Sequence, residues 1–388
     1  MKKKIAILGS TGSIGKSTLD IIKKDKKNFE IFFLSANSNY EDLVKQAIDL
    51  NAKNVLIYNK NYFKKVKFLL RKTKTKVYSG NTSLNKIINK KIDYTMSCIV
   101  GLAGLQPTID AIKISKVVAI ANKETIICAW EILSKIIKKY GTKVLPVDSE
   151  HYSIMELTKN LKNSDIKEII ITASGGPFLN LPLNKLKNIK PNQAVKHPNW
   201  KMGKKISVDS SNMMNKVFEL IEAFKFFDFD KKKYKIVIHP QSQVHSIIRF
   251  KNGLTKMILY DADMKIPISN TLYGLENKFP NQSKINVTLL NNLTFYDVDK
   301  NKFPSIKIID KILKSGQSAP IIINASNEIL VSLFLKGKIG FLDIVNTINN
   351  IFKDKDFKKY AKKKLKSVQD IKIIDSWARS KTISITTK

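Results

Sequence analysis

The residues whose types best suit chemistry lie in the segment 197–222, which reads as a polar loop followed by a helix. Asn215 and Glu219 are four residues apart, so on a helix they share one face. That face can present an amide and a carboxylate to one ligand, with Lys216 turned about 100° away at its rim. Hydroxyls and amides before a helix also suit an anion, because the first-turn N–H groups have no intrahelical partner. A capped amphipathic helix after a surface loop is the alternative interpretation.

Two further acids stand upstream of this segment, in Val-Asp148-Ser-Glu150-His. Asp148 and Glu150 are two residues apart at the end of a predicted strand, so both carboxylates are expected to point to one side. Two converging like charges are costly unless a cation joins them. Alone, the pair would be two solvated acids, but with Glu219 as a third ligand it becomes a site. Ligands that are all oxygen suit Mg²⁺ or Mn²⁺ rather than zinc.

Two glycine-containing turns are suited to phosphate groups. Ser174-Gly175-Gly176 follows a predicted strand at 166–171 and exposes backbone N–H groups and a hydroxyl. Near the N-terminus, a strand at 4–8 leads into Gly9-Ser-Thr-Gly12-Ser-Ile-Gly15 and then a helix. The order strand, glycine turn, helix is that of a dinucleotide-binding unit. In both places a plain glycine turn without a ligand is the alternative.

The ends of two later strands bear on the cofactor. The strand at 30–35 continues into Ala36-Asn37-Ser38-Asn39, without the acidic residue that binds the ribose of NAD, which favours NADP. The strand at 117–120 is closed by Asn122-Lys123-Glu124. Ligands bind at the carboxyl ends of the strands in such sheets. A helix start with a surface salt bridge is the alternative reading of the second segment.

The elements that must position these residues alternate between strands and helices from residue 4 to about 140, which predicts an open, mostly parallel sheet. Later strands are expected at 166–171, 206–208, 234–238, 244–250 and 254–259. Helices are expected at 310–314, 319–335, 342–352 and 355–377. The predicted fold class is therefore α/β, with a Rossmann-like NADP-binding domain at 1–149, a central α/β catalytic domain at 150–285, a linker at 286–309 and a helical bundle at 310–388.

The composition narrows the class of function. The 388 residues carry a formal net charge of +37, but only three of the 69 basic residues are arginine, and the lysines are spread along the chain. Nucleic-acid readers favour arginine, so a nucleic-acid partner is not expected. The patch from Lys353 to Lys366 is expected to form one solvated helix face. Apolar runs are too short for a membrane span or signal peptide, and two cysteines form no disulfide framework, so a cytoplasmic protein is expected.

Six motifs now stand in order: Gly-Ser-Thr-Gly-Ser-Ile-Gly, Ala-Asn-Lys-Glu, Pro-Val-Asp-Ser-Glu-His, Ser-Gly-Gly-Pro-Phe, His-Pro-Asn-Trp-Lys-Met-Gly and Met-Met-Asn-Lys-x-x-Glu. Together they resemble the 1-deoxy-D-xylulose 5-phosphate reductoisomerase family over nearly the whole chain. The resemblance implies conversion of that substrate to 2-C-methyl-D-erythritol 4-phosphate in isoprenoid synthesis, with NADPH and Mg²⁺ or Mn²⁺ as cofactors. It also implies a homodimer.

The resemblance assigns roles residue by residue. Asp148, Glu150 and Glu219 hold the metal, and Lys123 joins them among the catalytic residues. Trp200 lies on a mobile loop, residues 198–203, that closes over the substrate. Residues implied to bind the phosphorylated sugar are Lys123, Ser149, Glu150, Ser174, His197, Trp200, Ser210, Asn215, Lys216 and Glu219. Residues implied to bind NADPH are Thr11, Gly12, Ser13, Ile14, Ala36, Asn37, Ser38, Asn39, Asn122, Glu124 and Gly203.

Two points stand beside this resemblance. The family usually has a Gly-Lys-Asn-like tripeptide where this chain has Asn37-Ser38-Asn39, and Ser38 can donate only a neutral hydrogen bond in place of the lysine. The rival interpretation is another two-domain NADP-dependent dehydrogenase that acts on a phosphorylated or semialdehyde substrate. A semialdehyde enzyme would need an activated cysteine, whereas Cys98 and Cys128 lie in apolar surroundings in the sequence.

Overall fold

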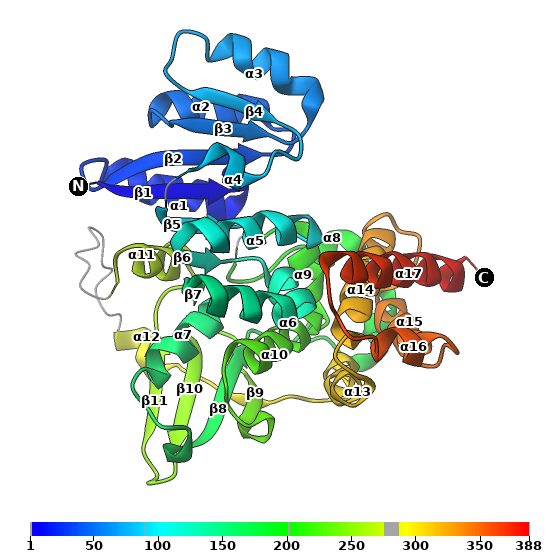
Figure 1. The fold of residues 1–388 in the computed structure, drawn as a ribbon. Helices are drawn as coiled ribbons and strands as arrows, with labels where there is room; N and C mark the ends of the chain where they lie inside the picture. Colours follow the sequence, from blue (N-terminus) through cyan, green and yellow to red (C-terminus); the bar gives the residue numbers. More distant parts are fainter. Residues whose placement is uncertain (1, 90, 201, 275–286, 388) are drawn as a thin grey trace. The chain divides into compact units, whose positions relative to one another are not determined.

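The computed structural model describes residues 2–89, 91–200, 202–274 and 287–387 (Figure 1). The chain forms two compact units. The first comprises residues 1–125, 131–152 and 264–282, and the second comprises 126–130, 153–263 and 283–388. The predicted boundaries of the linker and of the C-terminal bundle stay predictions.

The first unit is built on a parallel sheet of seven strands in the order β4-β3-β2-β1-β5-β6-β7. The order reverses at β1, and the side-by-side carboxyl ends of β1 and β5 form the crevice where ligands bind in such folds. This confirms the predicted Rossmann-like architecture. The strands are β1 (Lys3–Leu8), β2 (Phe29–Ala36), β3 (Asn54–Ile57), β4 (Lys76–Ser79), β5 (Ile92–Ser97), β6 (Ser115–Ile120) and β7 (Lys143–Pro146).

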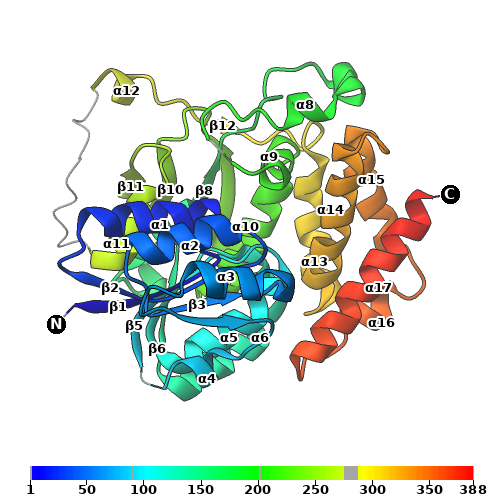
Figure 2. The ribbon, with the colours of Figure 1, turned by 90° about the horizontal axis from the view of Figure 1, so that it is seen from above.

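Helices cover both faces of this sheet (Figure 2). One face carries α1 (Ser13–Lys24), α2 (Tyr40–Asp49), α3 (Phe63–Leu69) and α11 (Lys265–Tyr273), whose apolar residues join one buried core with the strands. The other face carries α4 (Leu84–Ile87) and α5 (Leu105–Ile114). Two further helices, α6 (Lys123–Tyr140) and α7 (Ser149–Thr158), follow β6 and β7 along the chain.

Helix α11 belongs to the first unit although the sequence placed it in the central domain 150–285. Its residues Ile268 and Leu272 are buried in the core of the first unit. The hydroxyl groups of Thr271 and Tyr94 lie 2.8 Å apart, and Lys3 Nζ donates to the carbonyl of Leu272 at 2.6 Å. The chain therefore returns to complete the first unit after it has built much of the second.

The second unit has a mixed sheet in the order β11-β10-β8-β9-β12. Only β8 and β9 run parallel, and the other neighbours are antiparallel. The strands are β8 (Ile166–Ala173), β9 (Tyr234–Ile238), β10 (Val244–Phe250), β11 (Thr255–Leu259) and β12 (Tyr296–Asp297). Helices α8 (Pro191–Ala194), α9 (Lys204–Ser211), α10 (Met214–Phe226) and α12 (Val287–Asn291) accompany them.

The C-terminal part of this unit is a bundle, as predicted, and Figure 2 shows its helices side by side. The helices are α13 (Ile308–Ser315), α14 (Ala319–Leu335), α15 (Phe341–Phe352), α16 (Phe357–Ala361) and α17 (Val368–Thr386). Within the described residues, no helix combines the length and the apolar character needed to cross a membrane.

Three predictions about elements were wrong. The strand expected at 206–208 is part of α9: alternating Ile206 and Val208 suggested period two, but a three-residue window cannot distinguish a strand from a helix. The single helix expected at 355–377 is two helices, because Ser367 caps a new helix with Asp370 in a capping box. The patch from Lys353 to Lys366 therefore spans a turn, α16 and a loop rather than one helix face.

Candidate functional site

The turn after β8 lies against the end of α9 in the second unit. Gly176 has φ +66°, and a Cβ at this position would lie 2.9 Å from Ser211 Cα and 3.0 Å from the carbonyl oxygen of Ser210. Only glycine fits such a left-handed conformation at this distance without strain. The predicted phosphate turn that begins at Ser174 and the serines of α9 therefore come together, although more than 30 residues separate them.

His197 connects this turn to the loop that carries Trp200. Its Nδ1 lies 3.1 Å from the backbone N–H of Asn199 and 3.0 Å from that of Trp200, so Nδ1 accepts and is unprotonated. Its Nε2 therefore carries the hydrogen and donates to Ser174 Oγ at 2.8 Å. Burial lowers the pKa of His197 to about 4, which agrees with a neutral ring near pH 7.

Ser174 is thereby prepared to bind an anion. Its oxygen accepts from His197 and also from the backbone N–H of Gly176 at 3.1 Å. With two donors directed at its oxygen, the hydroxyl keeps its own hydrogen to donate. A phosphate oxygen is a suitable acceptor for that hydrogen.

The start of the Trp200 loop is held by the turn between β9 and β10. Asn199 Nδ2 donates to Ser242 Oγ at 3.0 Å, and the ring of Trp200 lies 6.0 Å from that of His245, edge to face. His245 itself is buried and stacks on Tyr260 with ring centroids 3.8 Å apart, so it supports the loop as part of the core. Position 201 of the predicted loop lies outside the described residues.

The sharp corner between α9 and α10 is made at Met213, which has φ +65°. Beyond it, Asn215 Nδ2 donates to Glu219 Oε1, which confirms that these two side chains share one helix face. Lys216 Nζ forms an ion pair with Glu219 Oε2. Lys216 was predicted at the rim of that face, but its side chain is buried. The reason is that the buried carboxylate of Glu219 requires a cation close by.

The acids of the first unit are positioned differently from the prediction. Strand β7 ends at Pro146 and α7 begins at Ser149, so strand alternation does not apply to Asp148 and Glu150. A carboxylate oxygen of each nevertheless lies within 4.8 Å of one of the other, because the chain turns between them into the first turn of α7. Ser149 Oγ donates to Glu150 Oε2 at 2.5 Å.

Lys123 supplies positive charge to this pair of acids. Its Nζ forms an ion pair with Asp148 Oδ2. Burial alone would raise the pKa of Asp148, but the neighbouring Lys123 ammonium group, with His151 beside it, holds that pKa well below its usual range. Asp148 is therefore ionised near neutral pH, as a ligand of a divalent cation must be.

In the Asn122-Lys123-Glu124 segment, Asn122 has a structural role. Asn122 caps α6: its Oδ1 accepts the N–H of Thr125 at 3.0 Å, and its Nδ2 donates to the carbonyls of Ile99 and Gly101. These hydrogen bonds use both polar atoms of the Asn122 side chain at this edge of the sheet. Its predicted contact with the cofactor stays a prediction, as does that of Glu124, which is buried in the first turn of α6.

The glycine turn after β1 fits the pyrophosphate of a dinucleotide. Gly12 is the N-cap of α1 and provides no side-chain cap, and the first turn, which includes Ser13 and Ile14, contains no acid. Its N–H groups can therefore bind an anion, together with the hydroxyl of Thr11. A Cβ on Gly15 would lie 2.5 Å from the carbonyl oxygen of Gly9, so the turn packs as closely as this motif requires.

A cationic side chain that the sequence analysis did not identify, Lys16, lies near the end of β2. Ala36 ends the strand, and Asn39 caps α2 by accepting the N–H of Asp42 at 3.1 Å. Lys16 of α1 reaches this corner, with its Nζ 2.7 Å from Asp42 Oδ2. The sequence could have identified Lys16 by its position in the first turn of α1, which lies beside the end of β2 in this fold. Ser38 Oγ accepts from Asn59, and Asn37 links β2 to α2.

Neither cysteine has the properties of a catalytic nucleophile. Cys98 is buried, its Sγ lies 3.0 Å from the carbonyl oxygen of Leu8, and burial raises the pKa of its thiol to about 12. Cys128 is also buried, within α6. The semialdehyde-type dehydrogenase, which needs an activated thiolate, is not favoured.

Family models match three stretches of the chain. The 1-deoxy-D-xylulose 5-phosphate reductoisomerase model matches residues 5–130, that family's C-terminal domain matches 144–227, and the DXP reductoisomerase C-terminal domain matches 259–381. A relative named 1-deoxy-D-xylulose 5-phosphate reductoisomerase from Pelagibacter ubique is 47% identical over 99% of both chains. A relative of the same name from Wolbachia pipientis of Culex pipiens is 41% identical over 97% of this chain and 96% of its own.

Solved structures agree with these relatives. The reductoisomerase from Zymomonas mobilis in complex with NADPH has a TM-score of 0.91, with 35% identity over 100% of this chain and 99% of its own. A DOX-P reductoisomerase in complex with NADPH, fosmidomycin and magnesium has a TM-score of 0.90, with 32% identity over 99% of this chain and 98% of its own. Because these matches extend over the whole chain, it belongs to the 1-deoxy-D-xylulose 5-phosphate reductoisomerase family.

Proposed function

We propose that this protein converts 1-deoxy-D-xylulose 5-phosphate to 2-C-methyl-D-erythritol 4-phosphate in isoprenoid synthesis, with NADPH and a divalent metal ion. The observation that carries the proposal is the α9–α10 corner, where the Ser174 turn packs against the end of α9 and the buried carboxylate of Glu219 stands on α10. That pairing suits a substrate with a phosphate at one end and oxygens for a metal at the other. The names of the relatives support the same substrate.

The phosphate of the substrate is bound by the second unit. Ser174 donates its free hydroxyl hydrogen, and Ser210 stands on the neighbouring turn of α9, where it is half-buried and accessible. Asn215 and Lys216 add an amide and an ammonium group from the start of α10. His197 keeps Ser174 oriented through its Nε2–H. This remote binding energy holds the reacting carbons in register.

The metal ion is held by Asp148, Glu150 and Glu219. These carboxylates are hard oxygen donors, and both Asp148 and Glu219 already lie against a lysine ammonium group, so each position accepts a cation. When bound, Mg²⁺ or Mn²⁺ acts as a Lewis acid toward the substrate carbonyl. Lys123 and Ser149, which contact the two acids of the first unit, are then placed to bind the substrate oxygens.

NADPH is bound at the glycine turn, with its pyrophosphate on the N-terminus of α1 and its adenosine end toward Asn37-Ser38-Asn39. When bound, it supplies the hydride that reduces the rearranged substrate. The Trp200 loop closes over the substrate and excludes water, with Gly203 as the N-cap of α9 at its far end. The cytoplasmic location stays a prediction.

A homodimer fits the exposed edge of the second sheet. Strand β11 is an edge strand among the described residues, and Leu254, Met257 and Leu259 on or beside it are exposed by 62%, 41% and 36%. An exposed apolar edge strand is a pairing surface. Met257→Lys is expected to shift the protein to monomers in light scattering after size-exclusion chromatography. A wild-type protein that is already monomeric would contradict the dimer without bearing on the reaction.

The reaction is tested by following NADPH oxidation at 340 nm with deoxyxylulose phosphate. We expect turnover that stops with a chelator and returns with Mg²⁺ or Mn²⁺, and little turnover with NADH. Substrate-dependent oxidation that persists in chelator at full rate would refute the metal site. No oxidation with any divalent ion would refute the function.

A further inference from the structure

The C-terminal bundle contains a polar run that the functions above do not use. Apart from Ser332, the polar residues of helix α14 lie in the run Asn324-Ala-Ser-Asn327-Glu328. Asn324, Ser326 and Asn327 are each exposed by 1% or less, and among the described residues Asn324 Oδ1, Ser326 Oγ and Asn327 Oδ1 have no hydrogen-bond partner. Buried polar groups without partners cost stability, so a helix selected only for packing would not keep them.

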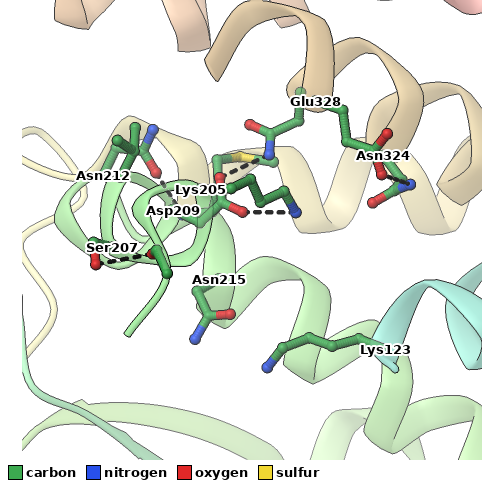
Figure 3. Close-up of polar contacts among 12 residues, drawn as sticks. Lys123, Lys205, Ser207, Asp209, Asn212, Asn215, Asn324 and Glu328 are labelled. Atoms are coloured by element: carbon green, nitrogen blue, oxygen red, sulfur yellow. Dashed lines mark hydrogen bonds and ion pairs between the residues drawn. The ribbon is translucent and has the colours of Figure 1, made fainter. Parts of the chain in front are cut away.

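One amide donor of this polar run forms a hydrogen bond to helix α9. Asn327 Nδ2 donates to Asp209 Oδ1 at 2.7 Å, and Asp209 is exposed by only 1%. The other carboxylate oxygen of Asp209 lies 2.8 Å from Lys205 Nζ. Figure 3 shows Asp209 between α9 and α14, joined to Lys205 on its own helix. A buried carboxylate that accepts from both directions fixes the rotation of α9 about its axis.

The α14 side of the contact is itself anchored. Asn324 Nδ2 donates to Glu328 Oε1 at 3.2 Å (Figure 3). Glu328 forms an ion pair with Arg379 of α17, and Arg379 donates to both oxygens of Asp375 at 2.7 and 3.1 Å. The position of Asn327 is therefore set by the bundle as a whole and not by one flexible side chain.

The rotation of α9 matters because the residue after Asp209 is Ser210. Successive helix residues point about 100° apart, so the rotation that directs Asp209 to α14 also fixes the direction of Ser210. The turn beginning at Ser174 packs against the backbone of Ser210 and Ser211. The end of α9 is thus held between the bundle and the phosphate turn.

We infer that Asp209 and Asn327 are positioning residues for phosphate recognition: their hydrogen bond orients α9 so that Ser210 faces the substrate phosphate. The inference rests on the proposed function for its kinetic readout. It gives the C-terminal bundle a role in substrate binding, because the bundle holds α9 in its orientation.

The test compares Asn327→Leu, which removes the donor, with Thr382→Ala, a buried substitution in α17. The Thr382 hydroxyl donates within its own helix, to the carbonyl of Ala378 at 2.7 Å. Both are expected to lower the melting temperature. Only Asn327→Leu is expected to raise KM for deoxyxylulose phosphate, by about tenfold, with kcat within about threefold and the Kd of NADPH unchanged. Asp209→Leu, which removes the acceptor and keeps the approximate size of the side chain, serves if Asn327→Leu does not fold.

The rescue variant is the exchange Asp209→Asn with Asn327→Asp, which restores an amide–carboxylate bond in the opposite direction. It is expected to bring KM back to within about threefold of wild type. Backbone amides of α9 are expected to exchange hydrogen faster in Asn327→Leu than in Thr382→Ala, a readout that does not need turnover. Equal KM and equal exchange in these two variants, or no recovery in the exchange variant, would overturn the inference. An inactive wild type would refute the proposed function and leave the exchange comparison to decide this one.

Discussion

The contact at Gly176 gives the sharpest prediction. Replacing it by alanine adds a methyl group where the nearest atoms are backbone atoms of Ser210 and Ser211, at 2.9 to 3.3 Å. Backbone cannot swing aside as a flexible side chain can. The substitution is therefore expected to move the end of α9 relative to the Ser174 turn.

The magnitude follows from the geometry. A non-glycine residue in the left-handed region costs about 1–2 kcal/mol, and Gly176 has φ +66°. The new methyl is also about half an ångström short of ordinary contact with Ser211 Cα, so the two segments must separate by that amount. Because a displacement of about 1 Å in a binding site can cost about 100-fold, we expect KM for deoxyxylulose phosphate to rise by about tenfold.

The matched control is Gly337→Ala at the end of α14. Gly337 has φ +70°, and nothing lies within 4 Å of an added Cβ, so it bears the conformational cost without a clash. Urea unfolding and NADPH oxidation are measured for both variants. Both are expected to lose stability, and only Gly176→Ala is expected to raise KM. Equal KM values would refute the idea that this turn and α9 form one anion-binding unit.

Three further variants test other parts of the site. Glu219→Gln is expected to retain the fold by circular dichroism and to lose metal-dependent turnover by about 100-fold or more; wild-type-like rates would remove Glu219 from the ligand set. His197 has a pKa lowered from 6.5 to about 4, so between these values the unfolded chain binds a proton that the folded chain does not. The unfolding free energy of wild type relative to His197→Gln should therefore fall as the pH is lowered from 6.5 to 4, and a difference that is independent of pH would disprove the neutral ring. Cys98→Ala is expected to keep turnover, and the buried thiol of the native wild-type protein should resist iodoacetamide. Rapid labelling with loss of activity would instead favour the semialdehyde-type dehydrogenase, which needs a cysteine nucleophile.

Local sequence patterns correctly predicted the geometry of two parts of the candidate site. Asn215 and Glu219 share a face because helix geometry depends only on their spacing, and the glycine turn was recognised because its strand and helix are adjacent in sequence. Asp148 and Glu150 were expected to be neighbours for a reason that proved wrong, since a helix start and not a strand brings them close.

Tertiary contacts were beyond the reach of the sequence. The bond between Ser174 and His197 joins residues 23 positions apart, and the ion pair between Lys16 and Asp42 joins two helices. The burial of Lys216 depends on its carboxylate partner and not on its place in the helix. The start of a separate helix at α17 could have been predicted from the sequence, because Ser367 and Asp370 have the spacing of a capping box.

The return of α11 to the first sheet has a consequence for biosynthesis. The dinucleotide-binding half of the protein lacks one of its covering helices until the ribosome has passed residue 273, long after its last strand has been made. Until then the apolar surface that Ile268 and Leu272 later bury stays open to water, and the nascent chain is a natural client for a chaperone. A fragment truncated at residue 149 would keep that surface permanently bare and should precipitate, whereas supplying the helix in trans or by fusion should keep it in solution.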